Sequence, residues 1–193
     1  MNDKAKEFIE IREGCDLFFK ETLDDALGNQ HLRISQEVAF YLLGILLIGV
    51  RKGPDDETRS VAERYMLAQS NEQVDELKAV GDSSLIIAGI WWQSLLRRLV
   101  DVDYYIAVGS RSYQKASEVS PKNLADLFEE LSDNFNSIVN VMAEATRCIS
   151  EANMSNNDVL RIYEVWLRTH NTFLEKKLRS LGINVVPGKT TKQ

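Results

Sequence analysis

The sequence predicts an all-α, single-domain bundle of about seven or eight helices around a central apolar helix. Three observations favour this class. The 193 residues include only 3 Pro and 10 Gly, too few for the many turns of a strand-rich fold. Apolar residues keep helical spacing over long stretches, as from Leu124 through Phe135 to Ile149. No segment alternates convincingly between apolar and polar residues, so no sheet is expected.

The composition is that of an ordinary globular domain, with 44% hydrophobic and 27% charged residues. At this length a core needs neither a metal nor a disulfide. Residues 1–182 are expected to form the domain and residues 183–193 a tail that is partly disordered after Pro187. Cys15 and Cys148 are far apart in sequence, and the first residues lack the apolar core of a signal peptide. We therefore expect a cytoplasmic protein.

Five helices are expected before the central segment. Their ranges are 3–13, 15–27, 36–52, 55–68 and 72–80. Ser35 is the expected N-cap of the third helix, because its hydroxyl can accept from a free N–H of the first turn. The longest apolar run, Val38–Val50, would span only about 20 Å as a helix, whereas a membrane core is about 30 Å thick. This run is therefore expected to be a buried helix, and no membrane span is expected.

Glycines mark several of the expected helix ends. Gly14, Gly28 and Gly81 are expected to end helices, because glycine readily adopts the left-handed conformation that follows a last turn. Asp82 is expected to cap the next helix. Gly182 is expected to end the last helix of the chain.

Two long helices are expected after the central segment. The first covers 121–151 and starts at Ser120-Pro121, a capping serine followed by proline at the first helical position. The second covers 156–181, and Ser155 with Asp158 resembles a capping box at its start.

The segment from Gly81 to Ser117 organises the rest of the chain. Residues 85–92, LIIAGIWW, are apolar on every side, which is typical of a helix in the middle of a bundle. Gly89 would cost about 1 kcal/mol there relative to alanine, and close approach of a neighbouring helix would offset this cost. A single helix over 83–119 would be about 55 Å long, but the domain diameter should be roughly 40 Å. We therefore expect a corner near residues 99–103, with Asp101 or Asp103 capping the second helix.

The corner is the candidate functional site. Aromatic and arginine side chains gather there, and these residue types are enriched at binding hot spots. The candidate residues are Trp91, Trp92, Arg97, Arg98, Asp101, Asp103, Tyr104 and Tyr105. They either form a polar network that pins the corner, or they line a pocket or a partner surface.

No pattern of catalytic residues or metal ligands is present. His31 and His170 lack a second ligand at metal-binding spacing, and no phosphate-binding loop or nucleophile motif occurs. Asp101 and Asp103 diverge on a helix, so they would not share a metal without the corner. We expect no catalytic residue, metal or cofactor.

The last expected helix carries the best argument for nucleic-acid binding. Its basic residues Arg161, Arg168 and Arg179 lie nearly in one line, and Lys176 and Lys177 add charge. Acidic residues lie near the same face, and the formal net charge of the chain is -6. We therefore do not expect a nucleic-acid partner.

The central segment also carries a resemblance. GDSSLIIAGIWWQSLLRRLVDVDYYIAVGSRSY resembles a segment of a family of bacterial all-helical proteins of similar length to which no activity is assigned. The shared features are a glycine–aspartate start, an apolar helix, an arginine pair, a VDVDYY-like block and a Gly…Tyr ending. The piece YLLGILL, Tyr41–Leu47, is similar as well. The resemblance covers about a third of the chain and implies a helical fold without an assigned chemistry.

Three functional hypotheses follow. The first is a non-enzymatic cytoplasmic interaction or regulatory protein, with a protein partner or a second copy of itself at the corner. The second is a helical sensor that binds a small ligand in an aromatic pocket between helices. The third is an enzyme that uses the two aspartates and two arginines of the corner on a phosphorylated substrate.

Overall fold

The computed structural model describes residues 3–52, 60–97, 101–147, 156–169 and 172–183. Within these ranges the chain forms nine α-helices, a π-helix and a 3-10 helix, and it contains no strand. The all-α class predicted from the sequence is therefore confirmed. The elements are α1 Asp3–Asn29, α2 Gln36–Lys52, α3 Val61–Ser70, α4 Val74–Leu85, the π-helix η1 Ile86–Ile90, the 3-10 helix η2 Trp92–Arg97, α5 Val102–Val119, α6 Lys122–Asp133, α7 Phe135–Ala145, α9 Asn156–Thr169 and α10 Thr172–Ser180.

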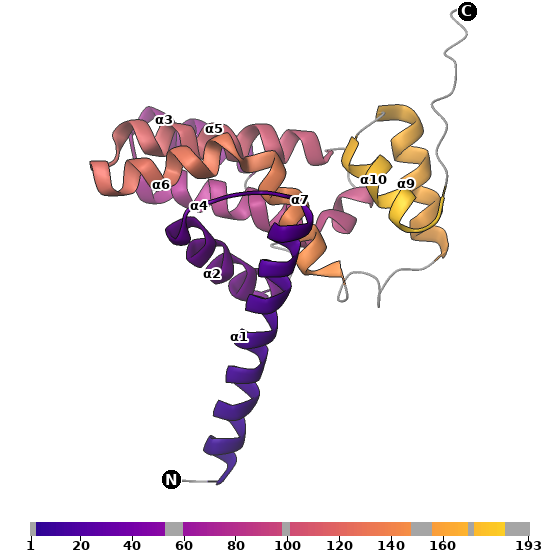
Figure 1. Cartoon of the computed structure of the whole chain (residues 1–193). Helices are drawn as coiled ribbons and strands as arrows, with labels where there is room; N and C mark the ends of the chain where they lie inside the picture. Colours follow the sequence, from indigo (N-terminus) through magenta and orange to yellow (C-terminus); the bar gives the residue numbers. More distant parts are fainter. Residues whose placement is uncertain (1–2, 53–59, 98–100, 148–155, 170–171, 184–193) are drawn as a thin grey trace, which may run out of the picture.

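Helices α2 to α7 form one bundle, in which α4 and α5 lie side by side and α6 lies beside α5 (Figure 1). The C-terminal part of α1 packs on α7 and α2, while its N-terminal part extends away from the bundle. Helices α9 and α10 lie together at one end of the bundle, and α9 contacts η2. The centre of the described part of the molecule is thus built from helices α2 to α7. The C-terminal part of α1 and the helices α9 and α10 pack on it from outside.

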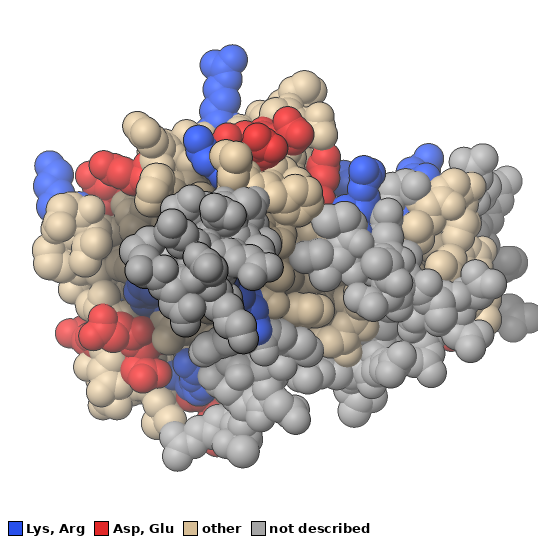
Figure 2. All heavy atoms as spheres, turned by 90° about the horizontal axis from the view of Figure 1, so that it is seen from below, with Lys and Arg blue, Asp and Glu red and all other residues tan. Residues whose placement is uncertain are grey.

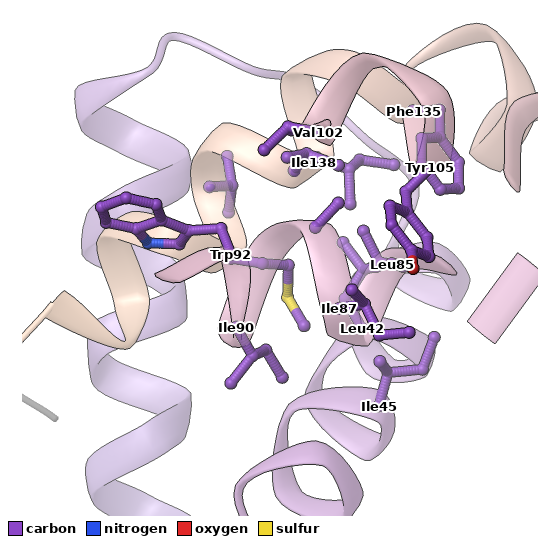
Figure 3. Packing of buried hydrophobic residues seen from close by; sticks show 14 of the residues in the cluster. Leu42, Ile45, Leu85, Ile87, Ile90, Trp92, Val102, Tyr105, Phe135 and Ile138 are labelled. Atoms are coloured by element: carbon purple, nitrogen blue, oxygen red, sulfur yellow. The ribbon is translucent and has the colours of Figure 1, made fainter. Parts of the chain in front are cut away.

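The apolar segment 85–92 lies at the centre of the bundle, as the sequence predicts. Leu85, Ile87 and Ile90 are buried, and Figure 3 shows them among side chains from α2, α5 and α7. A Cβ on Gly89 would lie 2.7 Å from the Cβ of Met142 in α7. The expected close approach of a neighbouring helix at this glycine is therefore confirmed.

The chain turns a corner before α5, and this prediction is also confirmed. The backbone bends at Trp91, continues through η2, and enters α5 after residues 98–100, which lie outside the described ranges. Asp101 is the N-cap of α5, because its backbone is extended and its carboxylate accepts from the N–H of Asp103 at 2.8 Å. A straight rod over 83–119 is excluded.

Three glycines that the sequence marks as helix ends lie inside helices, so those predictions are wrong. α1 passes through Gly14 and Gly28 to end at Asn29, and α4 passes through Gly81 to end at Leu85. A glycine inside a helix costs only about 1 kcal/mol relative to alanine, and packing by neighbouring helices can outweigh this. Gly182 alone behaves as expected. Its φ of +79° is left-handed, and the next N–H, of Ile183, donates to the carbonyl of Leu178.

Asp82 does not cap a helix, because it lies within α4. Elsewhere the N-terminal caps follow the prediction in part. The Ser35 hydroxyl accepts from the N–H of Val38 at 3.2 Å, as expected. At α6 the N-cap position is occupied by Pro121, and the buried hydroxyl of Ser120 makes no hydrogen bond. The expected cap at Ser155 lies outside the described residues.

The two long helices expected in the second half are each divided. Asn134, with φ −100° and ψ 7°, separates α6 from α7, and its side chain donates to the carbonyl of Glu130 at 3.0 Å. This side-chain bond competes with the regular helical pattern. The last helix is divided into α9 and α10, with residues 170–171 between them outside the described ranges. For the helix expected over 55–68, the structure describes α3, which begins after the N-cap Ser60.

Gly81 and Asp82 have a different role from the one predicted, because both contact Tyr113 of α5. A Cβ on Gly81 would lie 2.5 Å from Tyr113 Cε1, so the tyrosine ring rests directly on the α4 backbone. The Tyr113 hydroxyl donates to Asp82 Oδ1 at 2.7 Å. The hydroxyl of Tyr41 in α2 donates to the same oxygen at 2.5 Å, and Lys78 Nζ donates to Oδ2 at 2.7 Å. One carboxylate therefore joins α2, α4 and α5.

Further contacts along α4 and α5 keep the two helices close. The hydroxyl of the buried Ser112 donates to the carbonyl of Leu77 at 2.7 Å. Gly109 faces Ser84 of α4 and the ring of Phe135, and any larger residue at this position of α5 would overlap them. The α4–α5 pair is thus held by small residues at the contact and by hydrogen bonds across it.

We predict that Gly81→Ala destabilises the fold by about 1–3 kcal/mol, because the added methyl overlaps the buried Tyr113 ring. Urea unfolding measures the change. Gly28→Ala is the matched control, since a Cβ there meets nothing within 4 Å. A loss of stability no larger than that of the control would contradict the direct ring–backbone contact.

We also predict a loss of stability in alkali that depends on the tyrosines at Asp82. Burial, followed by the negative charge of Asp82, raises the pKa of Tyr41 and of Tyr113 above the ordinary value. The unfolded chain releases these protons near pH 10 while the folded chain retains them. The stability they contribute is therefore complete below about pH 10 and declines as the pH rises above it.

Tyr113→Phe should lower stability at neutral pH by about 1.5–3 kcal/mol, the usual contribution of a hydrogen bond to a charged group. The same variant should show a shallower decline of stability above about pH 10. Denaturant unfolding at a series of pH values checks both effects. An alkaline decline equally steep in the variant and the native protein would refute the assignment.

Candidate functional site

Described residues line a cavity of about 260 Å³ beside Trp92, and this cavity is open to solvent. Four segments that are distant in sequence meet there: the end of α1, the start of η2, the polar side of α7, and α10. The lining residues are Gln30, Trp92, Asn140, Ala143, Glu144, Arg147, Lys176 and Lys177. Of the candidate residues predicted from the sequence, only Trp92 belongs to this set.

Trp92 forms one wall of the cavity. Figure 3 shows its ring directed away from Leu85 and Tyr105 at the centre of the core. Only 1% of the residue is exposed, and Lys177 Nζ lies over the ring at 5.7 Å from its centroid. A cation over an indole face is attracted to it. This contact ties α10 to η2, so the wall and the adjacent ammonium group are held together.

Glu144 of α7 forms another part of the cavity lining. Its Oε1 accepts from Asn29 Nδ2 and its Oε2 accepts from Gln30 Nε2, both at 2.7 Å. Both carboxylate oxygens are therefore engaged by amides at the end of α1. These bonds join the end of α1 to α7, and they use the carboxylate that is present among the described lining residues.

The described lining residues of the cavity are mostly cationic, whereas the chain as a whole is acidic. Arg147, Lys176 and Lys177 are basic and Glu144 is acidic among them, while the whole chain has a formal net charge of -6. Asn140 adds an amide that can donate hydrogen bonds. Cationic groups within a concave site raise the local concentration of anions. The arrangement can therefore bind a small anion.

The tryptophan before the cavity has a structural role instead. Trp91 Nε1 donates to the backbone carbonyl of Gly49 at 2.9 Å, which joins the end of η1 to α2. A Cβ on Gly49 would lie 2.5 Å from Ile90 Cδ1, so the two segments are in close contact at this point. Although Trp91 and Trp92 are adjacent in sequence, Trp91 bonds to α2 and Trp92 lines the cavity.

The other corner residues that the structure describes do not line this cavity. Asp101 and Asp103 form the cap of α5 described above. The hydroxyl of Tyr104 accepts from the N–H of Ala62, in the first turn of α3, at 3.1 Å. Tyr105 is buried, and the rings of the tyrosine pair meet edge to face at 5.1 Å. The side chain of Arg97, and Arg98 as a whole, lie outside the described residues.

Apart from Trp92, the residues that line the cavity are not predicted as site residues from the sequence. A signal was present in α7 and just after it: Asn140, Glu144 and Arg147 recur at helical spacing on a segment that is otherwise largely apolar. In the sequence, Lys176 and Lys177 contribute only to the argument for nucleic-acid binding. Nothing in the sequence indicates that they face α7, because they are more than thirty residues away from it.

The described residues show neither a metal site nor a membrane-spanning helix. No group of three or more histidine, cysteine, aspartate or glutamate residues is arranged to hold a metal ion. No described helix is long and apolar enough to cross a membrane. Comparison with protein-family models, with curated proteins and with solved structures found no match for this chain.

At the corner we predict that Asp101→Ala destabilises the protein by about 1 kcal/mol, because the first turn of α5 loses its cap. Asp101→Asn should retain nearly full stability, since asparagine caps equally well although it lacks the charge. Thermal unfolding of the two variants distinguishes capping from a role of the negative charge. Equal losses in both variants would show that the charge matters.

Proposed function

We propose that this chain is a cytoplasmic, non-enzymatic helical sensor that binds a small organic anion in the cavity beside Trp92. One observation supports the proposal above the others: three cationic side chains meet at a cavity in a protein that is acidic overall. Ligand pockets in proteins are concave, with a few convergent polar groups and an aromatic or apolar wall. Here Trp92 and Ala143 supply the wall, and the cations and amides supply the polar groups.

The size of the cavity limits the ligand. Sites for drug-sized molecules usually measure about 300–1,000 Å³, and this one measures about 260 Å³. The best fit is a small acid with one or two carboxylate or phosphate groups. Arg147 is suited to bind such a group through two parallel hydrogen bonds, whereas the two lysines bind it as point charges.

Ligand binding would affect how the elements pack together. Arg147 follows α7, whereas Lys176 and Lys177 belong to α10. An anion between them would neutralise like charges on the two segments and hold α10 against the bundle. The position of α9 and α10 would then report the presence of the ligand, which is the behaviour of a regulatory protein.

The lining residues support binding rather than catalysis. Glu144, the one carboxylate among the described lining residues, accepts hydrogen bonds on both oxygens, so it is not poised as a general base. The described cavity lining includes no serine, cysteine or histidine that would act as a nucleophile.

Figure 2 bears on the choice of partner. On the face from which α1 projects, acidic and basic side chains are interspersed among the described atoms, without a broad area of one sign. In α10, Arg179 pairs with Glu175 at 2.9 Å. A nucleic-acid partner would favour a continuous basic surface. We therefore favour a small anion over nucleic acid, and we keep a protein partner at the corner as the second hypothesis from the sequence.

The test is calorimetric titration with a panel of small acids: inorganic phosphate, succinate, citrate and a sugar phosphate. We expect at least one to bind. Arg147→Gln and Lys176→Gln should each weaken binding about tenfold, because a hydrogen bond to a charged group contributes about 1.5–3 kcal/mol. Lys122→Gln is the matched control, since Lys122 is an exposed cation of α6 outside the cavity.

Tryptophan fluorescence gives a second reading of the same titration, because Trp92 lines the site. A ligand that binds the native protein and the Arg147→Gln/Lys176→Gln double variant equally well binds elsewhere, and this outcome would overturn the proposal. A panel in which no acid binds would also count against it.

A further inference from the structure

Four helical glycines in this protein lie where a side chain of another element packs directly against the helix backbone. Gly49, Gly81, Gly89 and Gly109 each face a neighbouring side chain so closely that a Cβ would overlap it. Glycine lowers helix stability relative to alanine, so its presence at these positions is explained by the close packing. Gly28 and Gly44 are different, because a Cβ on either would meet nothing within 4 Å. Gly28 lies in the last turn of α1, whereas Gly44 lies in the middle of α2 and is exposed.

The surface around Gly44 is apolar. Phe40 lies one turn before it and is 75% exposed, and Ile48 lies one turn after it and is 52% exposed. Residues four apart on a helix share a face, so these three form one continuous stripe. Two large apolar side chains on either side of a backbone notch make a surface shaped for a crossing helix.

The stripe ends in opposite charges. Glu37 lies seven residues before Gly44 and Arg51 lies seven residues after it, and both are exposed. Seven residues are close to two helical turns, so both charges lie on the same side as the apolar stripe. Arg51 is paired with Asp16 of α1 at 3.1 Å, an exposed pair that contributes little and can exchange.

We propose that this face of α2 binds the same face of a second copy of this chain. The stripe is self-complementary about Gly44. When two copies cross antiparallel on a two-fold axis at this glycine, Phe40 of one copy meets Ile48 of the other. Glu37 then lies opposite Arg51 of the second copy. The two glycines let the backbones approach, as the four packed glycines do inside the protein.

The symmetry of the stripe favours a second copy of this chain over an unrelated partner. A two-fold interface requires that each residue and its partner lie at equal distances on opposite sides of the axis. The apolar pair and the charged pair both meet this condition, at four and at seven residues from Gly44. An unrelated partner would not require either spacing. The face is one helix wide, so the dimer should be reversible and dependent on concentration.

The proposal is tested by sedimentation equilibrium of the full chain, from micromolar to millimolar concentration. We expect a monomer–dimer equilibrium. Gly44→Leu should weaken the dimer by about tenfold or more, because it fills the notch, while the folded monomer keeps its stability since the site is open. Gly28→Leu is the control, as it adds the same side chain at another open glycine and should leave the dimer unchanged.

Charge exchange tests the orientation of the two copies. Glu37→Arg alone and Arg51→Glu alone each place like charges opposite one another and should weaken self-association by about tenfold. An equimolar mixture of the two variants should associate again, because every pair across the axis is then of opposite sign. The double variant Glu37→Arg/Arg51→Glu should also associate with itself.

Three outcomes would overturn the proposal. If the chain remains a monomer at millimolar concentration, a second copy does not cover α2. If Gly44→Leu leaves the dimer unaffected, the interface lies on another surface. If the mixed variants associate no better than each variant alone, the antiparallel arrangement is excluded.

Discussion

The carboxylate of Asp82 determines how the central helices meet. Two buried tyrosine hydroxyls, from α2 and α5, donate to one of its oxygens, and Lys78 occupies the other. Hydrogen bonds to a charged group in a poorly hydrated site are strong, and a missing donor would leave a partly buried charge unsatisfied. The three helices are therefore fixed relative to one another. Tyr113 is also stacked on Phe128, which extends the constraint to α6.

The glycines make that geometry possible. Gly81 lets the ring of Tyr113 reach the α4 backbone, and Gly109 provides room for Phe135 on the other side. Protein interiors are packed as densely as crystals of small organic molecules, so one added methyl group at such a contact would displace the surrounding atoms. Gly81 and Asp82 of α4 thus meet Tyr113 of α5, and Tyr41 of α2 reaches the same carboxylate. Their close spacing around one carboxylate accounts for them as elements of the fold.

With the centre fixed, the outer segments complete both proposed surfaces. The end of α1 is held on α7 by Glu144, and α10 is held over Trp92 by Lys177, and together they line the cavity of the proposed anion site. On another side of the bundle, α2 buries Leu42 and Leu46 and leaves Phe40, Gly44 and Ile48 in water. One helix thus contributes both to the core and to the proposed interface, because its apolar residues occupy more than one face.

The sequence by itself determined the features that depend on neighbouring residues. These are the helical class, the cap at Ser35, a cap at Asp101 or Asp103 with the corner before α5, and the helix end at Gly182, because periodicity and capping act within a few residues. The tertiary structure decided the rest. Gly81 and Asp82 are read locally as a helix end and a cap, but their partners lie more than thirty residues away in α2 and α5. The cavity likewise joins four segments distant in sequence. Such contacts follow from how helices pack against one another, and local sequence patterns do not encode them.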